Sequence, residues 1–242
     1  MSPDDAGPTL PPVDPTLADR FSDDALSPEL LAGLLTDGDD ELAAWALSHA
    51  LRDAPRAEVY DGLLADAMRL VGERWQSGRW TVADEHLASQ TLLRALDRIR
   101  PDLGPDGRIG PLAVLAGVAG EQHMIGLVCL DHILREMGWT VAILGGDVPT
   151  GDLARFVERN DARLVALTAS DPQRTETVAE AVAAVRAAIA GTDRTAEVML
   201  GGRLAARPGV GAAVGADWTG STLVDAAAFA EGAMRRLGPA EA

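Results

Sequence analysis

The pattern of apolar positions divides the chain near residue 108. Before that point apolar side chains recur at helical spacing, and helices are predicted to begin at Ser27-Pro28-Glu29, after Asp39, at about residue 56 and at Thr81. Ser27 and Thr81 are typical N-cap residues, and Pro28 suits the first turn of a helix. Residues 27–100 are therefore predicted to form a four-helix bundle.

Residues 108–239 instead alternate between short apolar runs and helical segments. Strands are predicted at about 112–118, 139–144, 163–168, 196–200 and 213–216, and helices near 124–137, 150–160, 173–190 and 222–237. This alternation is typical of a parallel sheet covered by helices on both faces. The predicted fold class is α/β, with a Rossmann-like (flavodoxin-like) sheet domain preceded by the helical bundle.

The segments outside these two domains are rich in Pro, Gly and Asp. Residues 1–26 have the composition of a disordered tail, and Pro101 to Gly107 are predicted to be the linker. Hydrophobic residues at 47% and charged residues at 24% are ordinary for a soluble globular protein. No apolar run approaches the length of a membrane span, and the amino terminus does not resemble a signal peptide. We therefore expect a cytoplasmic protein without a membrane partner, whose lone Cys129 is a packed thiol.

Charge limits the partners further. The chain has 21 basic and 37 acidic residues, with a net charge of −16 and no basic run. Because clustered Lys and Arg carry the affinity of proteins for nucleic-acid phosphates, this composition argues against direct nucleic-acid binding.

The candidate chemistry follows the strand at 112–118. An acid, Glu121, lies two residues before His123, and Gly126 opens the next helix. Thr168 and Ser170 follow another strand, and Gly201-Gly202 ends a third. The carboxyl ends of parallel strands are where open α/β sheets bind their ligands. The nucleotide-binding alternative is disfavoured, because the loop after the first strand lacks the G-x-G-x-x-G pattern.

This series resembles the cobalamin-binding domain that takes B12 in its base-off, histidine-on form. The family pattern is acid-x-His-x-x-Gly, a Ser/Thr pair and then Gly-Gly, with Glu121 here in place of the more usual Asp. Over about residues 108–237, the resemblance implies that His123 is the lower axial cobalt ligand, oriented by Glu121. It also implies a slot for the nucleotide tail, lined by Thr168, Ser170, Gly201 and Gly202. The alternative interpretation is a capping acid, a packed histidine and turn glycines.

A second motif lies in the helical half. Trp75 is followed after nine residues by Glu85-His86, which resembles the W-x9-EH signature of the CarH-type adenosylcobalamin photoreceptors. The resemblance implies that the bundle covers the upper corrin face, where an indole shields the cobalt–carbon bond and a carboxylate accepts hydrogen bonds from the adenosyl ribose. The alternative is that Trp75 belongs to the bundle core and Glu85 complements a helix dipole.

Two features depart from that subfamily. Its DNA-binding members carry an amino-terminal winged-helix module, and residues 1–25 are too short and too polar for one, so we expect a standalone sensor. Gln76 stands where the photoreceptors place the histidine that captures cobalt after photolysis. The usual bis-histidine adduct is therefore in doubt unless His86 or another group serves.

Three functional classes follow. We favour a non-enzymatic light sensor that uses adenosylcobalamin and signals through a homo-oligomer or a partner protein. The alternatives are a corrinoid methyl carrier of a methyltransferase system and a B12-dependent antirepressor acting by protein contact. Related photocobilins also hold a bilin such as biliverdin, but no residue of this sequence establishes one.

Overall fold

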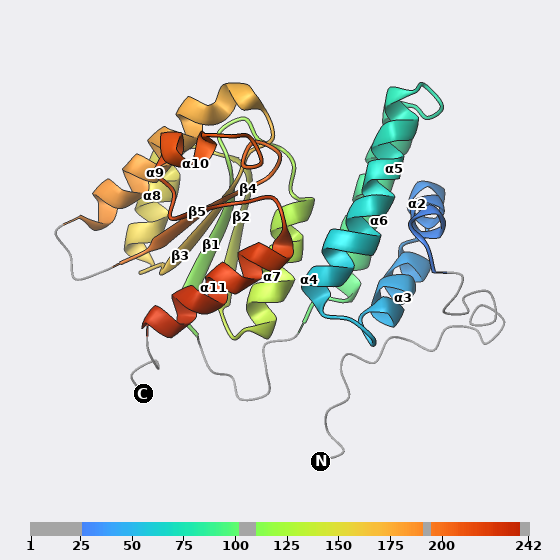
Figure 1. Cartoon of the computed structure of the whole chain (residues 1–242), viewed down its shortest axis with the longest axis horizontal. Helices are drawn as coiled ribbons and strands as arrows, with labels where there is room; N and C mark the ends of the chain where they lie inside the picture. Colours follow the sequence, from blue (N-terminus) through green and yellow to red (C-terminus); the bar gives the residue numbers. More distant parts are fainter. Residues whose placement is uncertain (1–25, 102–109, 191–194, 238–242) are drawn as a thin grey trace, which may run out of the picture. The chain divides into compact units, whose positions relative to one another are not determined.

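The computed structural model describes residues 26–101, 110–190 and 195–237. All but the last residue of the predicted tail at 1–26, and most of the predicted linker, lie outside these residues. The chain divides into two compact units between residues 102 and 103, one helical and one built on a sheet (Figure 1). None of the described helices is both long enough and apolar enough to cross a bilayer.

The helical unit has the four predicted helical segments. They are α2 (Pro28–Asp37), α3 (Asp40–Ala50), a third segment made of α4 (Arg56–Val59), a π-helical turn (Tyr60–Leu64) and α5 (Ala65–Gln76), and α6 (Val82–Arg98). Side chains of Ser27 and Asp39 cap α2 and α3, and Thr81 forms a reciprocal capping box with Asp84. The helices begin where these caps satisfy backbone N–H groups that would otherwise lack partners.

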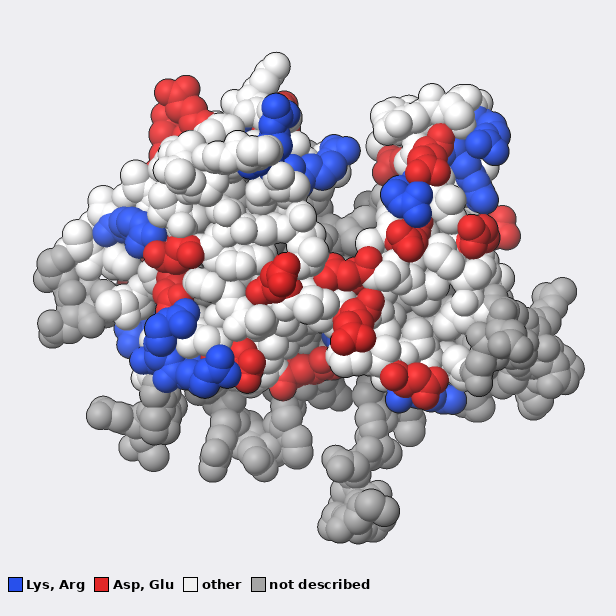
Figure 2. All heavy atoms as spheres, viewed as in Figure 1, with Lys and Arg blue, Asp and Glu red and all other residues white. Residues whose placement is uncertain are grey.

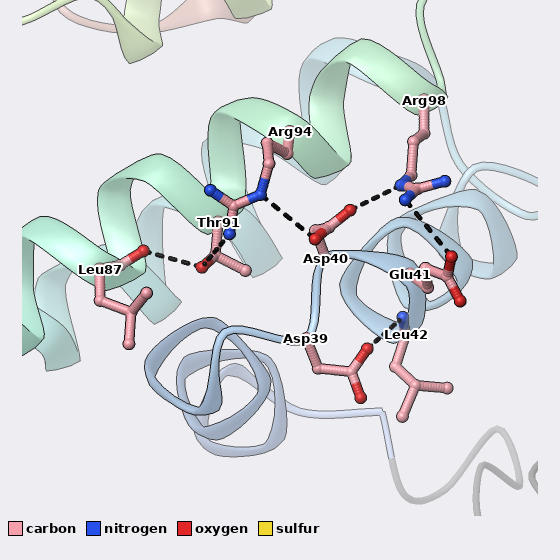
Figure 3. Close-up of polar contacts among 8 residues, drawn as sticks. All are labelled: Asp39, Asp40, Glu41, Leu42, Leu87, Thr91, Arg94 and Arg98. Atoms are coloured by element: carbon pink, nitrogen blue, oxygen red, sulfur yellow. Dashed lines mark hydrogen bonds and ion pairs between the residues drawn. The ribbon is translucent and has the colours of Figure 1, made fainter.

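An ionic network connects α3 to α6 (Figure 3). The Asp40 carboxylate accepts hydrogen bonds from Nε of Arg98 at 2.6 Å and Nε of Arg94 at 3.2 Å, and Arg98 also contacts Glu41 at 3.4 Å. The hydrogen bond from Arg98 is the largest influence on the pKa of Asp40, which lies below its ordinary value despite partial burial. Polar contacts thus supplement the apolar packing of Leu31, Leu35, Leu92 and Leu96.

The described part of the sheet unit contains five parallel strands in the order β2-β1-β3-β4-β5. They are β1 (Leu112–Val118), β2 (Thr140–Val148), β3 (Leu164–Thr168), β4 (Glu197–Gly201) and β5 (Trp218–Thr219). This is the flavodoxin-like strand order, in which β1 and β3 are neighbours and the chain leaves them toward opposite sides of the sheet. The predicted α/β fold is confirmed.

Helices cover both faces of the sheet. The helices α7 (Ile125–Glu136) and α11 (Leu223–Leu237) pack on one face, and α8 (Thr150–Arg159), α9 (Thr175–Ile189) and α10 (Val210–Val214) pack on the other (Figure 1). A short 3₁₀ turn, Pro172–Arg174, precedes α9. Cys129 is buried in α7, as predicted.

One predicted strand is wrong. The apolar run at 213–216 overlaps the end of α10, and the fifth strand is the two-residue β5 that follows it. Gly209 and Gly215 bracket this helix in the left-handed conformation, with φ of +81° and +69°. Glycine adopts these angles readily, so a helix of five residues starts and stops there.

Candidate functional site

Predicted site residues from the ends of three strands meet at the carboxyl edge of the sheet. Thr168 is paired in register with Gly117 of β1 and with Gly201 of β4. Thr168 is buried, and the loops that carry His123 and Ser170 leave the sheet beside it. The adjacency of β1 and β3 therefore brings together residues far apart in the sequence, such as Glu121 and Ser170, which are 49 positions apart. Ligand sites of open α/β sheets form in this way at the carboxyl ends of the strands.

Glu121 joins the loops after β1 and β3. One carboxylate oxygen, Oε1, lies 2.5 Å from Nδ1 of His123 and accepts a hydrogen bond from the backbone N–H of His123 at 2.8 Å. The other, Oε2, accepts a hydrogen bond from the backbone N–H of Ser170 at 2.5 Å. The Glu121 side chain is 3% exposed, whereas that of His123 is 69% exposed. The acid thus lies beneath an imidazole that faces outward.

These contacts determine which ring nitrogen of His123 is available. Burial has the largest single influence on the pKa of Glu121 and raises it, but the hydrogen bonds from His123 and Ser170 together outweigh burial and hold the pKa below its ordinary value. An ionised carboxylate can only accept, so Nδ1 of His123 carries the proton in the contact with Glu121. In the neutral imidazole, Nε2 then bears a lone pair suited to a transition metal.

The loop after β2 supports this arrangement. Asp147 accepts a hydrogen bond from the backbone N–H of Gly120 at 2.5 Å, and its own N–H donates to the carbonyl of Glu121 at 2.8 Å. Asp147 does this at a φ of +54°, in the left-handed region that non-glycine residues seldom occupy. A Cβ at Gly146 would lie 2.6 Å from the Glu121 carbonyl oxygen, so the close approach of the two loops requires glycine there.

A cleft of about 690 Å³ opens beside His123. Its lining comes from the loops after β1, β3 and β4 and comprises Gly120, Glu121, Gln122, His123, Ser170, Asp171, Pro172, Arg174, Arg203 and Arg207. The three arginines were not predicted as site residues. Arg203 directly follows Gly201-Gly202 in the sequence, and this position could have identified it as a candidate site residue.

The predicted glycines differ in what they do for the fold. Gly202 has a φ of +86°, and a Cβ there would lie 2.4 Å from the Ala169 carbonyl and 2.8 Å from Oγ1 of Thr168, so the strand ends themselves require it. A Cβ at Gly126 would meet no heavy atom within 4 Å, and one at Gly201 would only touch the Leu167 carbonyl at 3.8 Å. Neither position is crowded within the chain, which leaves room for a ligand.

The other three predicted site residues belong to the helical unit. Trp75 lies in the last turn of α5, and Glu85 and His86 lie in the first turn of α6. The carboxylate of Glu85 contacts Nδ1 of His86 at 2.6 Å and accepts a hydrogen bond from Ser89 at 2.9 Å. Trp75 is 43% exposed, so it is not a bundle-core residue. Gln76, the last residue of α5, is exposed as well.

Comparison with known families and proteins matches both units. Two family models described as a B12 binding domain match residues 29–100 and 111–227. Two transcriptional repressors of Myxococcus xanthus are similar in sequence. The HTH-type repressor CarH is 40% identical over 111 residues, or 46% of this chain, and the HTH-type repressor CarA is 38% identical over 97 residues, or 40% of this chain. These matches span 36% and 32% of the two repressors, about a third of their length.

The fold has a counterpart among solved structures. The monomethylamine corrinoid protein of Methanosarcina barkeri aligns with a TM-score of 0.69, covering 87% of this chain and 99% of its own. The two sequences are 17% identical over this alignment, so the likeness concerns the fold.

Proposed function

Because the chain belongs to the B12 binding domain family, we propose that it holds cobalamin at the carboxyl edge of its sheet, with His123 as the lower axial ligand of cobalt. The observation that carries the proposal is the exposed imidazole whose Nδ1 is occupied by buried Glu121. A corrin fills the equatorial positions of cobalt, so a single neutral nitrogen completes the lower side. Glu121 would fix the tautomer and raise the basicity of Nε2.

The donor set also fits the rest of the cofactor in its base-off form. The nucleotide tail, displaced by His123, would enter beside Thr168 and Ser170, where the strand ends of β3 and β4 are adjacent. Gly202 and Gly201 would let it pass close to the backbone. Gly126, where a side chain would meet nothing within the chain, leaves the start of α7 open to the corrin.

The similarity to CarH and the helical unit support a light sensor that uses adenosylcobalamin. When bound, this cofactor supplies a cobalt–carbon bond that light can break. In the proposal Trp75 shields the upper ligand from water with its exposed indole, and Glu85 accepts hydrogen bonds from the ribose with the lone pairs left by His86 and Ser89. Loss of the upper ligand would change these contacts and thereby the assembly of the protein or its contact with a partner.

The methyl-carrier alternative draws on the fold of the corrinoid protein from Methanosarcina barkeri. A carrier must offer its upper face to partner enzymes, and an indole and a carboxylate over that face would hinder such access. An antirepressor acting by protein contact is compatible with the sensor as its output. The matched family models name B12 and no bilin, so the proposal is confined to cobalamin.

Replacement of His123 tests the lower ligand. The absorption spectrum of the parent protein with cobalamin should be that of the histidine-on form, and His123→Gly should lose both this spectrum and most of the affinity. Added imidazole should restore the spectrum of His123→Gly, because it fills the space that the side chain leaves. An unchanged spectrum in His123→Gly would overturn the assignment.

Replacement of Trp75 tests the sensor. Trp75→Ala should bind adenosylcobalamin less well relative to methylcobalamin, and size-exclusion chromatography of the parent should differ between dark and light. Trp80→Ala is the matched control, because Trp80 lies nearby in sequence but its ring packs on the Arg74 guanidinium at 4.7 Å. Equal discrimination between the two cofactors by Trp75→Ala and the parent, with identical elution in dark and light, would favour the methyl carrier.

A further inference from the structure

The cleft beside His123 is rich in arginine although the chain is strongly acidic. Arg174, Arg203 and Arg207 line it, against two carboxylates, Glu121 and Asp171. Over the whole chain acidic residues outnumber basic ones by 37 to 21. The chain contains no lysine, so every blue side chain in Figure 2 is an arginine, and some of them lie at the end of the sheet unit where the loops near α10 are. The local charge balance is therefore opposite to that of the chain.

The loop that carries Arg203 and Arg207 is held in place by its backbone. The N–H of Leu204 donates to the carbonyl of Ala169 at 3.0 Å, and the N–H of Arg207 donates to the carbonyl of Leu204 at 3.1 Å. Leu204 is fully buried, whereas Arg203 and Arg207 are exposed on the cleft. The anchored Leu204 thus fixes the backbone from which the Arg203 and Arg207 side chains extend, next to the end of β3.

Neither carboxylate of the cleft neutralises these two arginines. Both oxygens of Glu121 are engaged by His123 and Ser170, and Asp171 accepts a hydrogen bond from the Gln173 N–H. Within the described residues, Arg203 and Arg207 form no ion pair with any carboxylate. Arg174 has a different task, because it donates to the Ala119 carbonyl at 2.8 Å and so supports the loop before His123. Two guanidinium groups in the cleft therefore have no anionic partner among the residues that the structure describes.

We propose that Arg203 and Arg207 bind the phosphodiester of the cobalamin nucleotide tail. The inference rests on the proposed function, since it places the tail beside Thr168 and Ser170. Arg203 directly follows Gly202, where an added Cβ would lie 2.8 Å from Oγ1 of Thr168, so the Arg203 side chain starts at the edge of that slot. The planar fork of a guanidinium matches phosphate oxygens with paired, charge-assisted hydrogen bonds. The pair would make this protein select complete cobalamin over corrinoids that lack the tail.

Cobinamide, which retains the corrin and cobalt but lacks the phosphodiester and the base, is the probe. The affinities of aquocobalamin and aquocobinamide are compared for the parent, for Arg203→Gln/Arg207→Gln and for the control Arg235→Gln, whose arginine pairs with Glu231 on the exposed face of α11. The double variant should bind cobalamin about tenfold or more weakly, bind cobinamide like the parent, and show a smaller salt dependence for cobalamin. Arg235→Gln should match the parent with both ligands.

The outcomes separate this inference from the proposed function. If the parent binds neither corrinoid, the proposed function fails. If the parent binds both but the double variant loses equal affinity for both, or for neither, the assignment of the arginines is overturned. Titration of the cofactor-free protein with ATP tests a separate nucleotide as the source of the phosphate. Binding of ATP that depends on Arg203 and Arg207, with cobalamin affinity unchanged in the double variant, would also overturn it.

Discussion

Replacement of Gly126 by alanine should change stability and cofactor affinity in opposite directions. Gly126 is the second residue of α7, its φ is not positive, and a Cβ there would meet no heavy atom within 4 Å. Alanine is favoured over glycine in helices by about 0.5–1 kcal/mol. We expect the free energy of unfolding of the cofactor-free Gly126→Ala protein to rise by about 0.5 kcal/mol, the low end of this range, because the position lies near the helix end.

Cofactor binding should respond in the other direction. If the corrin lies over the start of α7, the new methyl group occupies space that the ligand needs, and such overpacking costs about 1–3 kcal/mol. This corresponds to an affinity loss of about 5- to 150-fold. Cobalamin titration followed by absorbance gives the affinity, and thermal unfolding of the cofactor-free protein followed by circular dichroism gives the stability.

Gly151 provides a matched control in the same unit. It is the second residue of α8, and the nearest heavy atom to its added Cβ would be Nη1 of Arg155 at 3.9 Å. Gly151→Ala should gain similar stability and bind cobalamin like the parent. Parental affinity in Gly126→Ala would refute the placement of the corrin over α7, and a loss of stability would refute the inference that the position is open.

Three further predictions concern the ionic contacts. Glu121→Gln should lower the free energy of unfolding by about 2 kcal/mol. The glutamine NH₂ group would point at the backbone N–H of either His123 or Ser170, and that N–H would lose its acceptor. Since folding lowers the pKa of Glu121, the stability it contributes is present above its unfolded pKa and is lost as pH falls through the folded one. Unfolding curves of the parent and Glu121→Gln should therefore converge in acid, whereas exposed Glu180→Gln should match the parent at every pH. Asp40→Asn should destabilise the helical unit at neutral pH and lose this effect at low pH or high salt, since Arg98 and Arg94 lower the pKa of Asp40. Asp147→Gly relieves the strain of a non-glycine residue in the left-handed region but removes the acceptor of the Gly120 N–H, so the free energy of unfolding should change little. Hydrogen exchange at the Gly120 amide should become faster. Unchanged exchange at this amide would contradict the assigned contact.

The local parts of the structure were predictable from the chain itself. The helix starts at Ser27, Asp39 and Thr81 could be predicted because a capping side chain accepts a hydrogen bond from a backbone N–H only two or three residues away. The strands β1, β3 and β4 are largely apolar segments of five to seven residues whose central residues are buried. The spacing of Glu121, His123 and Gly126 is likewise local, and so is the W-x9-EH motif around Trp75. By contrast, the run at 213–216 was ambiguous, since a short apolar segment has no period by which a strand can be told from a helix.

What only the tertiary structure decided is how distant loops meet. Strand order places the loop after β3 beside the loop after β1, and Glu121 thereby receives the N–H of Ser170 from 49 residues away. The same arrangement brings Asp147 to Gly120, and Arg203 and Arg207 to the cleft of His123. No local pattern encodes these contacts, because they depend on which strands are adjacent and on how each chain segment leaves its strand. The sequence by itself determined the candidate ligand residues, and the packing of the sheet determined the charges and hydrogen bonds that surround them.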